Sequence, residues 1–458
     1  MRYISTRGGA AAVSFTEALL AGLAPDGGLY VPEAWPVLSQ DEISAFAGAP
    51  YAEIAARILG RFAGQALDPA EIRADCQAAY ATFAHAAVTP LRQLTAESWL
   101  LELFHGPTLA FKDVAMQMLA RLYQRVLAEQ GRKLTIVCAT SGDTGGAAVE
   151  AFRGSPNIDL VVLFPDGRIS EVQRRFMTAV PEDNVRCVAV DGTFDDCQAI
   201  LKALFADQAF ARAVDLSGVN SINWARIVAQ SVYYFTSAAA LGAPGRKISF
   251  TVPTGNFGDA FAGYVAHRMG LPIERIVVAT NANDILARAI ASGRYARGEV
   301  VATQSPAMDI QVASNFERLY FEAVGRDPAE TARAFTRFGA TGALALPSQA
   351  RGEISALFDA TSTDEAATAS TMAEAHRAYG ELIDPHTAVA LKAAAGRPGP
   401  MVILSTAHPA KFPEAVQAAV GRSAALPDRA GDLYARPERI TRLPADLEAV
   451  KAFVRQAR

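Results

Sequence analysis

The apolar residues of this chain change their spacing along its length. Before about residue 89 they recur every three or four positions, which predicts helices over residues 15–22, 40–46, 50–62 and 69–83. After residue 98, continuous apolar runs alternate with amphipathic segments such as 171–180 and 194–205. The runs are LTIVCA (134–139), DLVVLFP (159–165), VRCVAV (185–190), KISFTVP (247–253), RIVVA (275–279) and MVILS (401–405). This alternation predicts an α/β fold with mostly parallel sheets, preceded by a mostly helical N-terminal domain.

The composition is that of an ordinary globular protein. Of 458 residues, 51% are hydrophobic and 20% are charged, and the length is enough for two or three domains. A formal charge of −4 gives no reason to expect a nucleic-acid partner. No signal peptide opens the chain, and its most apolar helical run, residues 227–241, is too short and too polar to span a membrane. Cys76, Cys138, Cys187 and Cys197 have no C-x-x-C spacing, so we expect reduced thiols, no metal site and a cytoplasmic protein.

One lysine occupies an unusual position. Lys112 lies in the stretch LELFHGPTLAFKD (101–113), directly after the turn HGPTLAF and just before an amphipathic run over residues 114–127. Lysine is mostly a surface residue, and an amine between Phe111 and an inward-packing helix would be poorly solvated. Such an amine has a lowered pKa and can form an imine with an aldehyde. Taken alone, Lys112 is more often a lysine whose stem lies along a helix start while its amine reaches water.

Two loops have the composition of an anion-binding turn. TSGDTGG (140–146) and PTGNFGD (253–259) each follow an apolar run and precede a predicted helix. Glycine lets the backbone approach a ligand, and the free N–H groups at a helix start attract phosphate or carboxylate. Neither loop is a Walker A or dinucleotide motif, so the phosphate need not belong to a nucleotide. Such turns also use glycine for steric reasons alone, but two loops with hydroxyls favour anion binding; the hydroxyls are those of Thr140, Ser141, Thr144 and Thr254.

With these motifs the chain resembles the threonine synthases, pyridoxal-phosphate enzymes of the tryptophan-synthase-β-like fold, known as fold type II. The likeness runs nearly end to end. It is carried by YISTRG (3–8), GLAPDGGLYVP (22–32), HGPTLAFKD (105–113), TSGDTGG, NSINWARI (220–227), PTGNFGD, DPHTAVA (384–390) and LSTAHPAKF (404–412). The N-terminal block and the absence of an added regulatory domain resemble the longer bacterial and fungal branch of that family.

The resemblance implies a division into three parts. Residues 1–95 would form the N-terminal, mostly helical domain. Residues 96–218 would form a smaller α/β subdomain with Lys112 and TSGDTGG, and residues 219–458 a larger one with NSINWARI, PTGNFGD and LSTAH. By analogy, the cofactor would lie between the two α/β subdomains.

The resemblance also implies the residues that bind the cofactor. Lys112 would carry pyridoxal 5'-phosphate as an internal aldimine and, once the substrate displaces it, would move protons at Cα and Cβ. The cofactor phosphate would lie on backbone N–H groups at a helix start. These belong to Gly255, Asn256, Phe257, Gly258 and Asp259.

Two further cofactor contacts have alternatives. Related enzymes place an asparagine at the pyridine 3'-oxygen, where this chain has Asp143. A carboxylate would repel a phenolate unless one is protonated or a water intervenes, so the alternative is that Asp143 only caps the following helix. Thr406 matches the family's hydroxyl partner of the pyridine nitrogen, with Ser405 as its rival; taken alone, both would merely end a strand and cap a helix. A hydroxyl cannot stabilise a pyridinium as an aspartate would, which favours elimination and replacement over transamination.

The same resemblance implies six substrate-binding residues, namely Thr140, Ser141, Thr144, Asn220, Ser221 and Arg226. The last three lie in NSINWARI and match residues that contact O-phospho-L-homoserine in the family. A guanidinium suits phosphate recognition, although taken alone Arg226 is an ordinary helix arginine. The three hydroxyls of TSGDTGG would be shared between the substrate carboxylate and phosphate, in an allocation that the sequence leaves open. His105 either lines the pocket or is a hydrogen-bonded structural residue.

The predicted activity is that of a threonine synthase. O-phospho-L-homoserine and water would become L-threonine and phosphate, the last step of threonine biosynthesis, in a cytoplasmic monomer or homodimer. A first alternative is a phospho-lyase on the same fold that gives a 2-oxo acid, and it would use the same Lys112. A second is a binding protein without cofactor or catalysis, which is disfavoured because Lys112 and both glycine-rich loops are intact.

Overall fold

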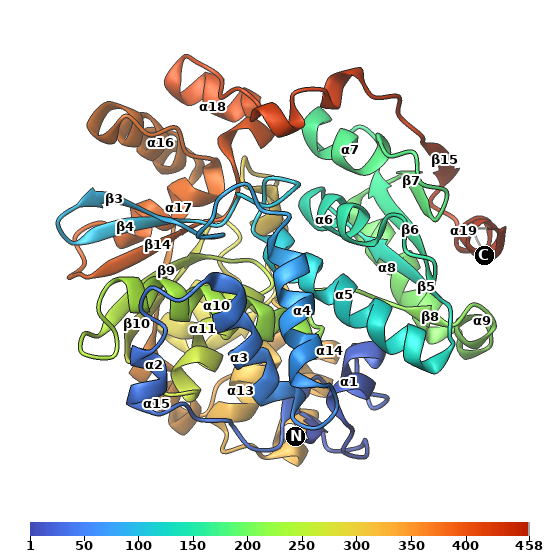
Figure 1. The fold of residues 1–458 in the computed structure, drawn as a ribbon, viewed down its shortest axis with the longest axis horizontal. Helices are drawn as coiled ribbons and strands as arrows, with labels where there is room; N and C mark the ends of the chain where they lie inside the picture. Colours follow the sequence, from blue (N-terminus) through green and yellow to red (C-terminus); the bar gives the residue numbers. More distant parts are fainter. Residues whose placement is uncertain (457–458) are drawn as a thin grey trace.

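Two large β-sheets covered by helices, together with two small two-stranded sheets, form the core of residues 1–456, the part of the chain that the computed structural model describes (Figure 1). The strands are β1 (Tyr3–Ser5), β2 (Tyr30–Pro32), β3 (Leu91–Thr95), β4 (Ser98–Glu102), β5 (Leu134–Ala139), β6 (Ile158–Pro165), β7 (Val185–Asp191), β8 (Leu216–Ser217), β9 (Ile248–Pro253), β10 (Ile273–Thr280), β11 (Arg294–Ala296), β12 (Ala343–Ala345), β13 (Phe358–Ser362), β14 (Met401–Ser405) and β15 (Thr441–Pro444).

The helices follow the same numbering. They are α1 (Phe15–Ala21), α2 (Gln40–Ser44), α3 (Tyr51–Ala63), α4 (Pro69–Tyr80), α5 (Lys112–Gln130), α6 (Asp143–Phe152), α7 (Glu171–Thr178), α8 (Phe194–Ala206), α9 (Gln208–Ala213), α10 (Trp224–Ala240), α11 (Gly258–Arg268), α12 (Ile285–Ser292), α13 (Phe316–Ala323), α14 (Pro328–Thr341), α15 (Ser348–Leu357), α16 (Glu365–Tyr379), α17 (Pro385–Ala394), α18 (Pro413–Val420) and α19 (Leu447–Gln456). Short 3-10 helices are η1 (Pro306–Met308), η2 (Pro409–Lys411), η3 (Asp428–Ala430) and η4 (Leu433–Ala435).

The two main sheets are mostly parallel. The larger has the strand order β13-β10-β9-β14-β4-β3, in which only the hairpin β3–β4 is antiparallel. The smaller has the order β15-β7-β6-β5-β8 and is parallel throughout. In Figure 1 the smaller sheet lies on the right and the larger on the left, and the red C-terminal segment crosses the top from one to the other. The prediction of an α/β fold with mostly parallel sheets is confirmed.

The predicted strands and helices agree closely with the structure where the sequence pattern is strongest. Every residue of β6 and β9 is buried, because helices cover both faces of a parallel sheet, and such strands are continuous apolar runs. The strand predicted over residues 134–139 is β5, and the helix predicted over 194–205 is α8. Helix α8 begins with a capping box, in which the Thr193 hydroxyl accepts a hydrogen bond from Asp196 N and the Asp196 carboxylate accepts one from Thr193 N.

Two segments lie in a different sheet from the one that their predicted residue range implies. Strands β3 and β4 flank the boundary between 1–95 and 96–218, yet both lie in the larger sheet beside β14. Strand β15 and helix α19 lie with the smaller sheet, although they belong to the predicted range 219–458. Both segments are short or partly exposed and have no long apolar run, so their pattern does not indicate which sheet they join.

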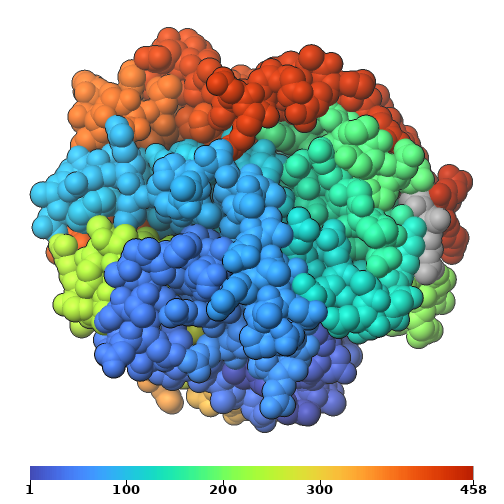
Figure 2. All heavy atoms as spheres, viewed as in Figure 1, coloured from blue at the N-terminus to red at the C-terminus, as the bar shows by residue number. Residues whose placement is uncertain are grey.

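The N-terminal helices share one hydrophobic core with the larger sheet and its helices. Trp224, at the start of α10, contacts Tyr3, Trp35 and Phe62 with ring centres about 6 Å apart. Figure 2 shows the dark-blue N-terminal residues spread over the lower part of the molecule. The N-terminal motif is also tied to α13, because Glu317 accepts hydrogen bonds from Thr6 Oγ1 at 2.7 Å and from the Arg7 guanidinium at 2.7 and 2.9 Å.

Two further observations concern the helices and the cysteines of residues 1–456. Between residues 1 and 456, no helix is both long enough and apolar enough to cross a membrane. The four cysteines are buried and form no disulfide, and burial raises the pKa of the Cys138 and Cys187 thiols to about 12.

Candidate active site

Two loops that follow strands of the larger sheet lie against each other and place Lys112. Thr406 directly follows β14, and its carbonyl accepts a hydrogen bond from Phe111 N at 2.8 Å. Two residues later, His408 N donates to Leu109 O at 3.0 Å. This short antiparallel pairing fixes the backbone just before α5, so Lys112, the first residue of α5, begins beside the end of β14.

The Lys112 side chain is buried. The residue is 8% exposed, and its Nζ lies 3.3 Å from Asp143 Oδ2 and 4.5 Å from the centre of the Phe111 ring. Burial lowers the pKa of this amine, and the negative charge of Asp143 opposes the lowering only in part. The alternative in which the amine reaches water is therefore excluded.

The Asp143 carboxylate contacts two lysines, Lys112 and Lys411. Its Oδ2 lies near Lys112, and its Oδ1 accepts from Lys411 Nζ at 2.8 Å and from Gln173 Nε2 at 3.0 Å. Burial alone would raise the pKa of this carboxyl, but Lys411 and Lys112 hold it well below its usual range. The residue does not cap α6: the N-cap is Gly142, whose φ is +131° and whose added Cβ would meet Gln173 at 2.5 Å. The capping alternative is therefore excluded.

The TSGDTGG loop uses one of its hydroxyls internally. Thr140 Oγ1 accepts hydrogen bonds from Gly142 N and Gly145 N, each at 2.9 Å, and Thr140 is buried. Ser141 and Thr144 are half-buried. The Thr140 hydroxyl can therefore still donate a hydrogen bond, but its oxygen already serves the loop.

Two side chains of the PTGNFGD loop, those of Thr254 and Asp259, are hydrogen-bonded within the loop. Thr254 Oγ1 accepts from Phe257 N at 3.0 Å and donates to Asp259, whose carboxylate also accepts from Ala260 N at 2.9 Å. Phe257 has a φ of +65°, which lets α11 begin directly at the next residue. A Cβ at Gly255 would lie 2.8 Å from Ala307 O, so only glycine fits there. Because Asp259 faces the loop interior, its negative charge does not oppose an anion at the helix start.

Arg226 is a buried cation without a carboxylate partner. It is 3% exposed, and its Nη1 donates to Val219 O at 2.9 Å. Its Nε has no hydrogen-bond partner, and no carboxylate among residues 1–456 forms an ion pair with it. Burial lowers the pKa of the guanidinium to about 10. Because a buried charge without a counter-ion is costly, such an arginine indicates a site for an anionic ligand.

Helix α13 holds the NSINWARI and PTGNFGD loops together. Asn315 Nδ2 donates to Ser221 O at 3.2 Å and to Asn256 O at 3.1 Å, which joins one loop to the other. Arg318, fully buried, donates to Ile222 O at 2.6 Å and is bonded to Asn315 Oδ1 as well. The position of Arg226 relative to the start of α11 is thereby fixed.

The hydroxyls of Ser405 and Thr406 differ in their neighbours. Ser405 Oγ lies 3.0 Å from Thr387 Oγ1, which is itself bonded to Asp384. Thr406 is 3% exposed and is held through its backbone carbonyl by Phe111. The Ser405 hydroxyl is therefore part of a buried network behind the strand end, while Thr406 follows it at the edge facing α5.

His105 has a structural partner. Its Nε2 lies 2.7 Å from Glu102 Oε2, and its ring is packed between those of His85 and Phe104. This arrangement agrees with the alternative of a hydrogen-bonded structural histidine.

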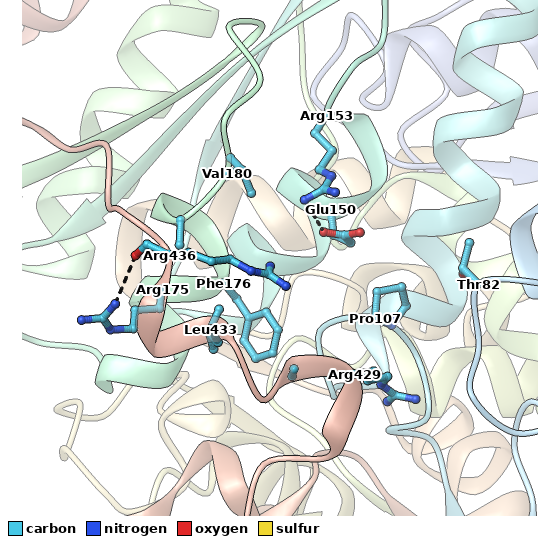
Figure 3. A pocket seen from close by; sticks show the side chains of 12 residues that line it. Thr82, Pro107, Glu150, Arg153, Arg175, Phe176, Val180, Arg429, Leu433 and Arg436 are labelled. Carbon is cyan, nitrogen blue, oxygen red and sulfur yellow. Dashed lines mark hydrogen bonds and ion pairs between the residues drawn. The ribbon is translucent and has the colours of Figure 1, made fainter.

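A cavity of about 220 Å³ lies among α6, α7 and the C-terminal segment (Figure 3). Phe176 lines it and also lies 5.3 Å from Lys411 Nζ. Four arginines surround the cavity, and each already has a partner: Arg153 has Glu150, Arg175 has the carbonyl of Tyr434, Arg429 has the carbonyl of Gly106, and Arg436 has Asp432. Arg153, Arg175 and Arg436 are paired with carboxylates and Arg429 is exposed, whereas Arg226 is buried without a carboxylate partner, so this cavity is a weaker candidate for an anion site.

The residues around Lys112 fit a phosphorylated aldehyde. The amine is buried, the start of α11 at Gly258 offers glycine-rich backbone N–H groups, and Thr406 offers a hydroxyl. Sequence reasoning missed the four residues that arrange these groups, Gln173, Asn315, Arg318 and Lys411. Only Lys411 carried a signal, as a lysine among the small and apolar residues of LSTAHPAKF.

Comparisons with known proteins agree with this site. Residues 2–80 match a family model described as threonine synthase N terminus, residues 83–405 one described as pyridoxal-phosphate dependent enzyme, and residues 387–454 one described as threonine synthase, C-terminal. Threonine synthase of Pseudomonas aeruginosa is 51% identical over 461 residues, covering 100% of this chain and 98% of that protein.

Solved structures give the same result. A crystal structure of PLP-bound threonine synthase from Brucella melitensis matches with a TM-score of 0.97 at 51% identity, covering 100% of this chain and 99% of that chain. Threonine synthase from yeast matches with a TM-score of 0.93 at 36% identity, covering 100% and 98%. This chain belongs to the threonine synthase family of pyridoxal-phosphate-dependent enzymes.

Proposed function

We propose that this chain converts O-phospho-L-homoserine and water to L-threonine and phosphate, with Lys112 as the cofactor lysine. The observation that carries the substrate assignment is Arg226, a buried guanidinium with a free Nε and no carboxylate partner among residues 1–456. A substrate that brings its own phosphate supplies the missing negative charge.

Four groups would hold the cofactor. Lys112 is the amine for its aldehyde, and backbone N–H groups within residues 255–259 would bind its phosphate at the start of α11; that of Phe257 already donates to Thr254 Oγ1. Thr406 would donate to the pyridine nitrogen; its rival Ser405 is already bonded to Thr387. Asp143 would lie near the 3'-oxygen, with its charge balanced by Lys411.

The remaining polar residues would bind the substrate. Arg226 would take the phosphate as a planar fork, supported by the side chains of Asn220 and Ser221 in the same loop. Ser141 and Thr144, both half-buried, would share the carboxylate and phosphate, whereas Thr140 can contribute only as a donor.

The chemistry follows from this placement. Bound pyridoxal phosphate draws electrons from the substrate Cα and so makes its proton acidic. The Lys112 amine, once released from the cofactor, would take this proton and a second one from the neighbouring Cβ. Phosphate would leave from Cγ toward Arg226, and Cα and Cγ would each take up a proton in turn. Water would supply the hydroxyl at Cβ and a proton for the phosphate, so the overall reaction balances.

Location, assembly and domain limits are part of the same proposal. We infer a cytoplasmic enzyme, monomeric or homodimeric, without nucleic-acid or membrane partners. The three ranges 1–95, 96–218 and 219–458 would describe its parts, apart from the two segments formed by β3–β4 and by β15 with α19.

The product of the purified protein with O-phospho-L-homoserine tests the proposal. We expect L-threonine and inorganic phosphate in equal amounts, identified by chromatography and by a phosphate assay. Release of phosphate with a 2-oxo acid in place of threonine would instead identify the phospho-lyase alternative.

Replacement of Lys112 by alanine should remove the link to the cofactor. Lys112→Ala should fold, should lose the visible absorbance band of the bound cofactor, and should form no threonine, because no amine remains at the start of α5. The measurement is absorbance together with borohydride reduction and peptide mapping. A reducible link at the wild-type level in this variant would mean that another lysine is the anchor.

Replacement of Arg226 by lysine keeps the charge but removes the planar fork. Arg226→Lys should cost about 1–3 kcal/mol in kcat/KM for the phosphorylated substrate and should leave cofactor affinity almost unchanged. The control is Arg125→Lys, which alters a helix arginine paired with Asp75 away from the site. Equal losses of substrate and cofactor affinity would assign Arg226 to the cofactor phosphate or to the fold.

A further inference from the structure

A second lysine, Lys411, lies beside the first, and in the proposed function it only balances the charge of Asp143. Lys411 has no exposed surface, and its Nζ donates to Thr108 O and to Asp143 Oδ1, each at 2.8 Å. Its backbone is held as well, because Lys411 O accepts from Ser170 Oγ at 3.0 Å. Fully buried lysines are rare, and this one is fixed from two sides.

The two lysines share a single carboxylate unequally. Asp143 lies 2.8 Å from Lys411 Nζ but 3.3 Å from Lys112 Nζ, and Gln173 Nε2 also donates to the oxygen that faces Lys411. A carboxylate paired with Lys112 alone would favour the ammonium form of that lysine. A second ammonium nearby has the opposite effect, because two adjacent positive charges repel.

Other charged groups near the pair are committed elsewhere. Asp113 faces Lys411 but accepts hydrogen bonds from Thr108 N and Thr108 Oγ1, at 2.8 and 2.7 Å. Asp259 faces Lys112 but accepts from Thr254 and from the backbone of α11. Burial raises the pKa of both these carboxyls, so Asp143 is the carboxylate that decides the charge of Lys112.

We propose that Lys411 is a positioning residue for the cofactor lysine: it occupies the Asp143 carboxylate and thereby leaves the Lys112 amine in its reactive, uncharged form. The proposal rests on the assignment of Lys112 under Proposed function. The amine nitrogen needs its lone pair to attack the aldehyde carbon of pyridoxal phosphate, after which the carbonyl oxygen leaves as water. An ammonium has no lone pair to offer. The same condition applies whenever Lys112 is released from the cofactor and has to accept a proton from the substrate.

The test is the pH dependence with which the full-length protein, stripped of cofactor by hydroxylamine, forms its covalent link with added pyridoxal phosphate. Lys411→Met should shift the pH midpoint of the rate upward by about one unit, because Asp143 then pairs with Lys112 alone. Asp143→Asn should shift it downward, because Lys411 then acts unopposed. Lys133→Met is the matched control: this lysine is 44% exposed and pairs with Asp159, and its loss should leave the midpoint unchanged.

Shifts of opposite sign cannot come from a general loss of structure, which would move both variants the same way. An unchanged midpoint in a folded Lys411→Met protein overturns the proposal. If that variant does not fold, Lys411→Gln takes its place, because an amide is uncharged but can still donate to Thr108 O; the midpoint should again rise, and no rise in the folded variant overturns the proposal equally.

Peptide mapping after borohydride reduction separates this proposal from the one on which it rests. A label on Lys112 with unshifted midpoints contradicts the role of Lys411 alone. A label on another lysine in the unmodified protein contradicts the assignment of Lys112, and the role of Lys411 with it.

Discussion

The site depends on a buried carboxylate that three separate parts of the chain surround. Asp143 begins α6, Lys112 begins α5, and Lys411 ends η2, so this cluster forms only when the loops after β4, β5 and β14 meet. Burying the Asp143 carboxylate and the Lys411 ammonium is costly unless each has partners, and here Gln173 and the carbonyl of Thr108 complete the set. The close approach of Gln173 in turn requires glycine at position 142.

A second framework, centred on α13 and the residue before it, holds the anion-binding loops. Asn315 and Arg318 on α13 join the NSINWARI loop to the start of α11, and Arg318 also donates to Tyr30 O in β2. Glu317, between them, accepts hydrogen bonds from the N-terminal motif. The N-terminal motif is therefore connected to these loops through α13.

The sequence indicated the candidate site residues better than the residues that hold them in place. The position of Lys112 drew attention because a lysine at the start of an inward-packing helix is unusual, but its proposed role came from the family motifs around it. Strands β5, β6 and β9 could be predicted because strands covered on both faces are unbroken apolar runs. The hydrogen-bond partners of Asp143 and Thr140 could not be predicted from the sequence, because only the folded chain brings these residues together. The strand β15 was missed for a related reason: its four residues are half-exposed and carry no apolar run.

The most direct test of this account is a crystal structure of the enzyme with its cofactor and an unreactive phosphonate analogue of the substrate. The account predicts that Lys112 is bonded to the cofactor, that the cofactor phosphate lies at the start of α11, that the phosphonate lies on Arg226, and that Asp143 remains paired with Lys411. A cofactor bonded to Lys411, or a cofactor phosphate on Arg226, would contradict it.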